Sequence, residues 1–388
     1  MSRPKSPTAL KPSPLPGEGG ATAPGEGASF ASRLLTWFDT HGRHDLPWQH
    51  PREPYRVWLS EVMLQQTQVT TVIPYFERFL ARFPDVQTLA AAPIDDVLQR
   101  WAGLGYYARA RNLHRCAQAV VELRGGEWPR DIEQMIALPG VGRSTAAAIL
   151  SQAFGDRHAI LDGNVKRLLS RHAAVAGWPG LPAVQQRLWN YAEKLLPDAR
   201  LADYTQACMD LGSQVCVSRR PLCAVCPVAG DCGARLQDRV AELPASKPKR
   251  DRPQRSAWLL LIENDKAALL LERRPPSGIW GGLWCPPVIA AEQDWRAELA
   301  ARYGLRAESV QALEPVEHSF THYDLSLQPL RLRVAPAGVA EAGATAWTTM
   351  SDPSTLPGLP APVRKILDAA YFAPQKAQQS LWPEPSTA

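Results

Sequence analysis

The fold of the first half of this chain is decided by a tight glycine-rich turn and the helical run behind it, LPGVGRSTAAAIL at residues 138–150. Gly140 and Gly142 can take a positive φ and let a ligand approach the backbone closely. The free N–H groups at the start of the following helix can then bind a phosphate of DNA. Any hairpin of two helices can contain a Pro-Gly turn, so this stretch alone favours a purely structural turn. Other motifs of the chain, described below, decide whether this turn also has a function.

Around this turn the chain divides into parts of different periodicity. Residues 28–236 carry apolar positions at helical spacing, interrupted by proline and glycine. A basic, proline-containing linker follows at 237–255. Residues 256–372 contain the short apolar runs typical of strands. The polar ends, 1–27 and 373–388, read as disordered tails. We therefore predict a mainly α domain, a linker and an α+β domain.

Composition and charge narrow the class of protein. A length of 388 residues with 45% hydrophobic residues fits two globular domains. No stretch approaches the roughly 20 apolar residues of a membrane span, and the start of the chain lacks the apolar block of a secretory signal. We expect a monomer in the cytoplasm, associated with the nucleoid if the source is bacterial. Residues 100–115 hold four arginines and no acid around two tyrosines, which suits DNA binding about as well as an ordinary surface helix.

Four of the seven cysteines cluster in one short stretch, at Cys216, Cys223, Cys226 and Cys232. Without a secretory signal, disulfides are not expected, and such clustering indicates a metal site. Structural zinc sites usually pair two short Cys-x-x-Cys motifs, whereas only one is present here. A cubane iron–sulfur cluster also takes four thiolates and accepts irregular spacing. The spacing favours the iron–sulfur cluster and leaves zinc as the alternative.

Two carboxylates stand in opposed surroundings. Glu61 lies in an apolar segment, 57–67, which as a helix is largely buried. Desolvation there raises the pKa of the carboxyl, as a general acid requires. Asp162 stands at the start of a predicted helix, where a simple N-cap role competes with a function. The helix N-terminus is expected to lower its pKa and keep it ionised. Such a pair suits cleavage of a bond to the anomeric carbon of a sugar.

Taken together, these motifs resemble the helix-hairpin-helix DNA glycosylases that carry an iron–sulfur cluster, and among them the adenine DNA glycosylases of the MutY type. Matching segments run from 42–48 through 59–67 and 103–112 to the hairpin, 161–167 and the four cysteines. The resemblance implies an enzyme of base excision repair that flips out an adenine paired with 8-oxoguanine or guanine and hydrolyses its N-glycosidic bond. It also implies a [4Fe-4S] cluster on the four cysteines.

The resemblance implies roles for individual residues. Glu61 is the acid that protonates adenine, and Asp162 stabilises the sugar cation or bonds to it transiently, with Asn164 beside it. The implied DNA contacts are Gln65, Gln66, Thr67, Leu104, the aromatic wedge Tyr106, Gly140, Gly142, Ser144, Phe320, Thr321 and His322. The implied adenine pocket consists of Leu46, Trp48 and Gln206.

One position separates the adenine glycosylases from the related endonuclease III-like enzymes, which attack the sugar with a lysine of the hairpin helix. Ser144 occupies that position here, and a serine cannot form a Schiff base. The resemblance therefore implies a glycosylase without lyase activity. A lyase acting on oxidised pyrimidines remains the second hypothesis.

Residues 256–372 resemble the Nudix-like domain of adenine glycosylases, most clearly in RPPSGIWGGLW at 274–284. Nudix hydrolases hold Mg²⁺ with several glutamates on one helix, whereas the matching stretch 294–304 offers only Glu298 in its helical core. We therefore expect a reader of the lesion, not a hydrolase. The family reads 8-oxoguanine with a Phe-Ser-His loop, matched here by 320–322, where threonine keeps the hydroxyl. A third hypothesis, a non-catalytic lesion binder or a nucleotide hydrolase, lacks support from these residues.

Overall fold

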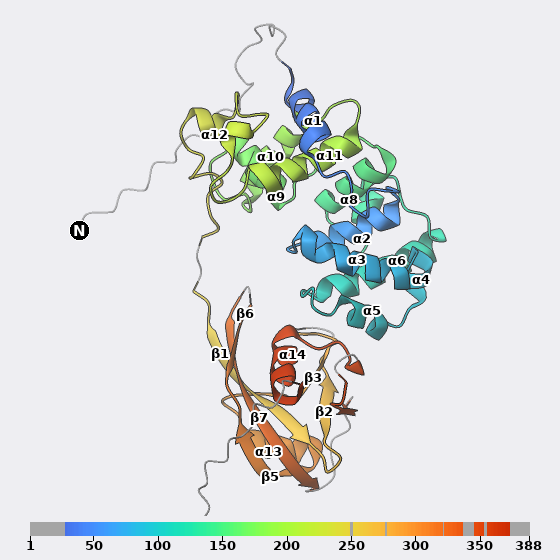
Figure 1. Ribbon diagram of the computed structural model, residues 1–388, viewed down its shortest axis with the longest axis vertical. Coiled ribbons are helices and arrows are strands. Elements are labelled where there is room, and N and C mark those ends of the chain that lie inside the picture. The colour runs from blue at the N-terminus through green and yellow to red at the C-terminus, as the bar shows by residue number, and fades with distance from the viewer. Residues whose placement is uncertain are drawn as a thin grey trace, which may run out of the picture. The chain divides into compact units, whose positions relative to one another are not determined.

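The computed structural model describes residues 28–248, 251–275, 278–320, 322–336, 345–352 and 355–372 (Figure 1). The predictions for both tails, for part of the linker and for Thr321 lie outside the described residues. Residues 28–90 with 115–248 form one compact unit, and residues 91–114 with the described residues from 251 onward form the other.

Residues 28–236 are helical, as predicted. The helices are α1 (Phe30–His41), α2 (Pro54–Leu64), α3 (Val69–Arg82), α4 (Val86–Ala91), α5 (Ile94–Trp101), α6 (Ala108–Arg124), α7 (Ile132–Ile136), α8 (Arg143–Ile149), α9 (Gly163–His172), α10 (Pro182–Lys194), α11 (Leu201–Asp210) and α12 (Gly233–Leu236). Two π-helical turns, η1 (Leu150–Phe154) and η2 (Leu211–Val215), continue α8 and α11, and a 3-10 turn, η3 (Cys223–Val225), lies between cysteines.

Packing of α1 against α8–α11 builds the main core of the first unit. Leu34 and Phe38 of α1 are completely buried among residues of those helices, such as Leu188. Burial of each such side chain stabilises the fold by about 1.5–3 kcal/mol. Helix α2 contacts both α8 and η1, so its last turn faces the helix that follows the glycine-rich hairpin. This packing positions Glu61.

The second part of the chain is α+β, as predicted. Its strands are β1 (Gln254–Glu263), β2 (Ala268–Arg273), β3 (Trp284–Cys285), β4 (Val288–Ala290), β5 (Leu305–Ala312), β6 (Val316–Ser319), β7 (Asp324–Pro336) and β8 (Thr345–Thr349). The helices are α13 (Trp295–Tyr303) and α14 (Ala361–Leu367), followed by a π-helical turn, η5 (Asp368–Phe372).

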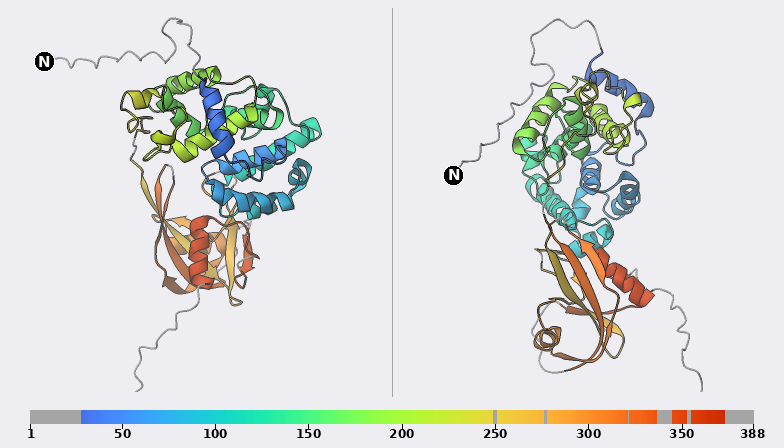
Figure 2. Two further views of the ribbon diagram at one scale, coloured as in Figure 1. Left: turned by 45° about the horizontal axis from the view of Figure 1, so that its top comes forward. Right: turned by 90° about the vertical axis from the view of Figure 1, so that its left-hand side faces the viewer.

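One mixed sheet organises this domain. The strand order is β3-β2-β1-β7-β5, with β4, β6 and β8 pairing to β1, β7 and β2. Strands β1 and β7 run parallel, and Figure 2 shows them as two long, twisted neighbours in yellow and orange. Trp295 and Leu299 of α13 pack on the buried residues Leu260, Leu330 and Leu332 of these strands. β6 and β7 form an antiparallel hairpin whose turn carries the predicted reader residues.

Candidate active site

Glu61 lies in the last turn of α2 and is partly buried. Gln152, on the π-helical turn η1, donates a hydrogen bond from Nε2 to Oε1 of Glu61 at 3.2 Å. Burial raises the pKa of Glu61 to about 7, with a further contribution from the negative charge of Asp162, while the bond from Gln152 opposes the rise. The predicted rise is confirmed. Glu61 can therefore hold a proton near neutral pH.

Asp162 caps the N-terminus of α9, as predicted. Its carboxylate accepts a hydrogen bond from the Val165 N–H at 2.7 Å. The expected lowering of its pKa is wrong, because burial raises the pKa by more than the backbone N–H groups and the charges of Arg167 and Lys166 lower it. The helix terminus acts in the predicted direction but does not dominate. Asp162 is thus a desolvated carboxylate held in place by its cap.

Asn164 is fixed by Arg167, one helical turn later. Nη2 of Arg167 donates to Oδ1 of Asn164 at 2.9 Å and to the carbonyl of Gly212, and Nε donates to the carbonyl of Cys216 at 2.7 Å. A Cβ on Gly212 would lie 2.8 Å from Cβ of Asn164, so only glycine fits this approach. Sequence reasoning missed both Arg167 and Gly212.

Gln206 presents an acceptor inside the helical unit. Its side chain is 2% exposed, and its Nε2 donates to Oδ1 of Asp210 at 2.7 Å. The Oε1 atom is buried and has no hydrogen-bond partner among the described residues. Asp210 is itself fully buried and accepts from the N–H and Nε of Arg43 at 2.7 and 2.9 Å. This network fixes the amide with its oxygen available, and sequence reasoning missed Arg43 and Asp210.

The other two predicted pocket residues, Leu46 and Trp48, are also buried. They lie on the segment between α1 and α2, where Gln49 accepts a hydrogen bond from the N–H of Leu46 at 3.1 Å. The ring of Trp48 packs edge-on against Phe76 of α3, with centroids 5.3 Å apart. Both side chains are therefore held by the core.

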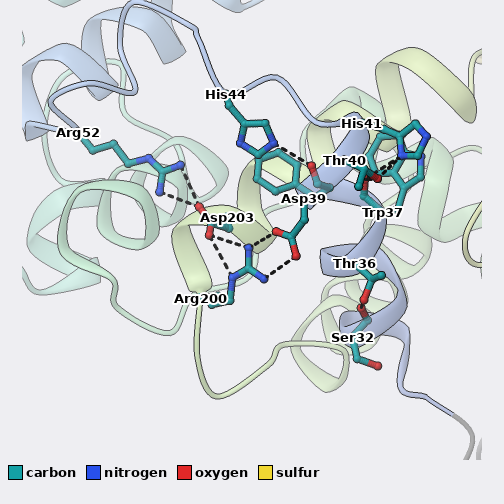
Figure 3. Close-up of polar contacts among 11 residues, drawn as sticks. Ser32, Thr36, Trp37, Asp39, Thr40, His41, His44, Arg52, Arg200 and Asp203 are labelled. Carbon is teal, nitrogen blue, oxygen red and sulfur yellow. Dashed lines mark hydrogen bonds and ion pairs between the residues drawn. The ribbon is translucent and has the colours of Figure 1, made fainter.

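An ion-pair network braces α11 against α1 and the segment before α2 (Figure 3). Arg200 donates to Asp39 at 3.1 Å and to Asp203 at 3.1 and 3.2 Å, and Arg52 donates to the same Asp203 at 3.0 Å. The bond from Arg200 lowers the pKa of Asp39. Arg200 has a φ of +58°, a conformation that non-glycine residues rarely adopt. The network therefore holds the start of the helix that carries Gln206.

The four clustered cysteines line one cavity, with apolar walls that include Leu168, Val215 and Val228. Arg171 donates from Nη1 to Sγ of Cys216 at 3.4 Å, and the Cys232 thiol donates to the carbonyl of Arg171 at 3.6 Å. Burial raises the pKa of the Cys226 thiol to about 11. Four thiols around one cavity form a donor set for a metal cluster.

Nothing in the described part of the chain brings three or more His, Cys, Asp or Glu side chains together on a single ion. The remaining cysteines, Cys116, Cys208 and Cys285, are buried, as predicted for ordinary core residues. Burial raises the pKa of the Cys116 and Cys208 thiols to about 12. These three thiols are therefore kept in their neutral form.

The glycine-rich hairpin uses the freedom of its two glycines differently. Gly140 has a φ of +76°, whereas Gly142 has a φ of −90° and serves as the N-cap of α8. The cap position takes extended backbone, so only Gly140 uses the positive φ that glycine permits. A Cβ at Gly142 would meet nothing within 4 Å, so the helix start is open. The Ser144 hydroxyl accepts the N–H of Leu161 at 3.0 Å and so holds the residue before Asp162.

Two strained turns carry other predicted DNA contacts, one in each compact unit. Gln65 ends α2, and the exposed Gln66 after it has a φ of +60°; the Thr67 N–H bonds to the carbonyl of Leu64 at 3.2 Å. Tyr106 has a φ of +49° and is 52% exposed. Leu104, in contrast, is 6% exposed, and its contact with DNA stays a prediction.

The predicted reader residues lie at the turn of the β6–β7 hairpin. The Phe320 N–H bonds to the carbonyl of Tyr323 at 2.9 Å and closes the turn, and His322 is exposed. Thr321 lies outside the described residues. On α13, Glu298 accepts from Gln293 at 3.3 Å.

Comparison with known proteins covers both parts of the chain. Residues 59–194 match the HhH-GPD superfamily of base excision DNA repair proteins, and residues 257–369 match the NUDIX domain. The adenine DNA glycosylase of Buchnera aphidicola subsp. Acyrthosiphon pisum is 34% identical over 341 residues, which cover 87% of this chain and 97% of that protein. The adenine DNA glycosylase of Mus musculus is 37% identical over 385 residues, covering 84% and 74%.

Among solved structures, a thermostable thymine-DNA glycosylase is 30% identical, with a TM-score of 0.49 over 54% of this chain and 95% of its own. Throughout the described part of the chain, no helix combines the length and the apolar character that crossing a membrane requires.

Proposed function

The chain belongs to the adenine DNA glycosylase family, and from that premise we propose that it removes adenine opposite 8-oxoguanine or guanine in double-stranded DNA without cleaving the strand. As a DNA N-glycosylase of base excision repair, it releases adenine from its sugar. Because the target bond lies inside the base stack, the adenine must first leave the duplex. The observation that carries the proposal is the pairing of Glu61 with Asp162, whose charges interact in a buried site.

Glu61 acts as the general acid. With a pKa of about 7, its carboxyl carries a proton in about half of the molecules at neutral pH and can pass it to the adenine ring. Departure of the protonated base leaves positive charge on the sugar. Asp162 stabilises that charge, or bonds to the sugar transiently, before water attacks. The N–H groups of Val165 and Asn164 favour the ionised form of Asp162 that this role requires.

Gln206 and the apolar residues Leu46 and Trp48 form the adenine pocket in this proposal. The unpartnered Oε1 of Gln206 can accept a hydrogen bond from the exocyclic amine of adenine. A base without that amine would leave this buried acceptor unsatisfied, at a cost of about 1–3 kcal/mol. The pocket thus favours a base with a donor at that edge.

DNA contacts are assigned to the hairpin and to the two strained turns. The open start of α8 offers backbone N–H groups to a phosphate. Gln65 and Gln66 enter the space that a flipped base leaves. The exposed ring of Tyr106 stacks on a base. Non-glycine residues at positive φ cluster at ligand-binding sites, where the strain is part of the function.

The absence of lyase activity rests on Ser144. Its hydroxyl accepts a hydrogen bond from the backbone N–H of Leu161. A serine side chain also carries no amine that could attack the sugar. Hydrolysis therefore ends at an abasic site, which other enzymes process.

The second domain reads the base opposite the adenine. The β6–β7 turn presents the exposed His322, and Phe320 lies beside it. The Thr321 hydroxyl supplies a hydrogen-bonding group in place of the family serine. Glu298 is the single glutamate of α13, whereas a magnesium-dependent Nudix hydrolase needs several glutamates on this helix.

The four thiols around one cavity fit a [4Fe-4S] cluster held by Cys216, Cys223, Cys226 and Cys232. Only one short Cys-x-x-Cys motif is present, Cys223 to Cys226, whereas structural zinc sites usually take two, which favours the cluster over zinc. The cluster would take one thiolate from each of the four cysteines. When bound, it would cross-link this part of the chain.

A single-turnover assay on duplexes with adenine opposite 8-oxoguanine tests the proposal. We expect strand breaks at the adenine only after alkali or heat, which cleave the abasic site. Breaks without that treatment would contradict the absence of lyase activity. No base release, despite tight binding, would contradict the enzymatic role. We further propose that the protein acts as a monomer in the compartment that holds DNA, the cytoplasm and nucleoid of a bacterium.

A further inference from the structure

Trp280 is a buried and strained residue that the mechanism above does not use. Its φ is +56°, a conformation that bulky residues rarely adopt, and its side chain is 9% exposed. The segment around it is closed by backbone hydrogen bonds from Arg274 to Leu283 at 2.8 Å and from Leu283 to Trp280 at 3.0 Å. Such strain costs about 1–3 kcal/mol and persists only where the surroundings over-determine the conformation. The position of this ring is therefore a specified feature.

The ring of Trp280 packs beside the reader turn. Its centroid lies 5.9 Å from that of Phe320 and 6.4 Å from that of His318. His318, on β6, meets Phe320 edge-to-face at 4.6 Å and 83°. These separations lie in the range where aromatic pairs attract, each contributing about 0.5–1.5 kcal/mol beyond burial. Burial lowers the pKa of His318, so its imidazole is neutral at pH 7 and suited to this packing.

A different neighbour contacts the Phe320 ring from within the turn. Tyr323 is 4% exposed, and its centroid lies 4.9 Å from that of Phe320. The Arg255 guanidinium lies 4.6 Å from the Tyr323 ring centroid and braces it. The backbone of the turn is set by pairing of Ser319 with Asp324, but that pairing does not fix a side-chain rotamer. The rings around Phe320 therefore orient its side chain. Among them, Trp280 comes from a segment that is distant in the sequence, whereas His318 and Tyr323 are close to Phe320 along the chain.

We propose that Trp280, with His318, is a positioning residue that fixes Phe320 and thereby sets the preference for 8-oxoguanine over guanine opposite the adenine. The proposal rests on the reader function proposed above. The two partner bases differ by one oxygen and one N–H, so discrimination between them requires groups held within about 0.5 Å. A reader whose aromatic support is lost samples several orientations and binds both bases alike. Chemistry at the adenine does not depend on this support.

The test uses the whole protein and single-turnover adenine release from two duplexes, with 8-oxoguanine or guanine opposite the adenine. Trp280→Gly removes the ring while glycine accepts the positive φ, so the backbone is not the cause of any effect. Trp280→Phe retains an aromatic ring, and His318→Leu removes the second partner while retaining an apolar side chain. Trp347→Ala, at a 44% exposed tryptophan on β8, is the matched control.

For Trp280→Gly we expect the ratio of the two rates, measured below saturation, to fall at least tenfold, while the saturated rate on the guanine duplex is unchanged. His318→Leu gives a smaller fall, Trp280→Phe restores most of the ratio, and Trp347→Ala keeps it. A wild-type ratio in Trp280→Gly overturns the proposal. An equal loss on both duplexes in Trp280→Gly and His318→Leu also overturns it, since these residues would then support only folding. A wild-type enzyme without any preference would instead refute the reader function itself.

Discussion

Replacing Glu61 with glutamine should slow base release by about 10²–10⁴-fold and, above neutral pH, make the protein more stable. The folded state raises the pKa of this carboxyl from 4.5 to about 7, so between these values the folded protein binds a proton that the unfolded chain releases. Stability is therefore lost as the pH rises through this window, the opposite of an ordinary surface carboxylate. A neutral glutamine has no charge to desolvate and keeps the acceptor for Gln152.

The size of the effect follows from the two pKa values. At pH 8, the raised pKa of Glu61 lowers the free energy of unfolding by about 3 kcal/mol. At pH 5, where the folded protein keeps the proton, it lowers the free energy of unfolding by less than about 1 kcal/mol. The free energy of unfolding of Glu61→Gln should therefore exceed that of the wild type by up to about 3 kcal/mol at pH 8, with little difference at pH 5. General acid catalysis is worth about 10²–10⁴-fold, and the rate of base release should fall by that factor while mismatch binding persists.

Urea denaturation followed by helical circular dichroism at pH 5 and pH 8 measures the stability difference, alongside single-turnover base release. Glu122→Gln, at an exposed glutamate on α6, is the matched control and should change neither quantity. In the wild type, the rate of base release should fall about tenfold per pH unit above 7, as the acid loses its proton. A variant less stable than the wild type at pH 8, or one that turns over normally, would refute the reasoning.

Four further variants, at three positions, test other parts of the first unit. Cys226→Ser should remove the broad absorption of an iron–sulfur protein and lower stability, and an undiminished spectrum would exclude this thiol as a ligand. Ser144→Lys should introduce strand cleavage without alkali, by placing an amine where the Ser144 hydroxyl now accepts the N–H of Leu161, the residue before Asp162; persistence of purely alkali-dependent cleavage would contradict the assigned position. Arg200→Ala should lower stability by about 1–2 kcal/mol through its lost ion pairs, while Arg200→Gly, which accepts the φ of +58°, should lose about 1 kcal/mol less. Equal losses in these two variants, measured by urea denaturation, would show that Arg200 stores no strain.

Much of the secondary structure could be predicted because the hydrophobic periodicity of the sequence is clear in most helices and in the long strands. The helices of residues 28–236 and the apolar runs of β1, β2 and β7 follow directly from spacing. The raised pKa of Glu61 could be predicted because nearly all of its neighbours in α2 are apolar. The shift at Asp162 was predicted with the wrong sign, because the N-cap is visible in the sequence, whereas the depth of burial depends on helices from elsewhere in the chain.

Long-range partners could not be predicted for the same reason. Arg43 and Asp210, or Trp280 and Phe320, meet only after folding, and no local pattern pairs them. Arginine that binds carbonyl groups, as Arg167 does, has no sequence signature. A spacing of four residues between Gln206 and Asp210 does indicate one face of α11, and this signal was available.

Two of the π-helical turns, η1 and η2, explain why the residues that contact Glu61 and Asn164 are hard to predict from the sequence. α8 continues as η1, which carries Gln152 to Glu61, and α11 continues as η2, which brings Gly212 against Asn164. A π-helical turn inserts one residue into a helix and rotates all later side chains out of the α-helical register. Its composition does not differ from that of an α-helix, so periodicity places these residues on the wrong face. Single π-helical turns are frequent at functional sites, and η1 beside Glu61 and η2 beside Asn164 fit that pattern.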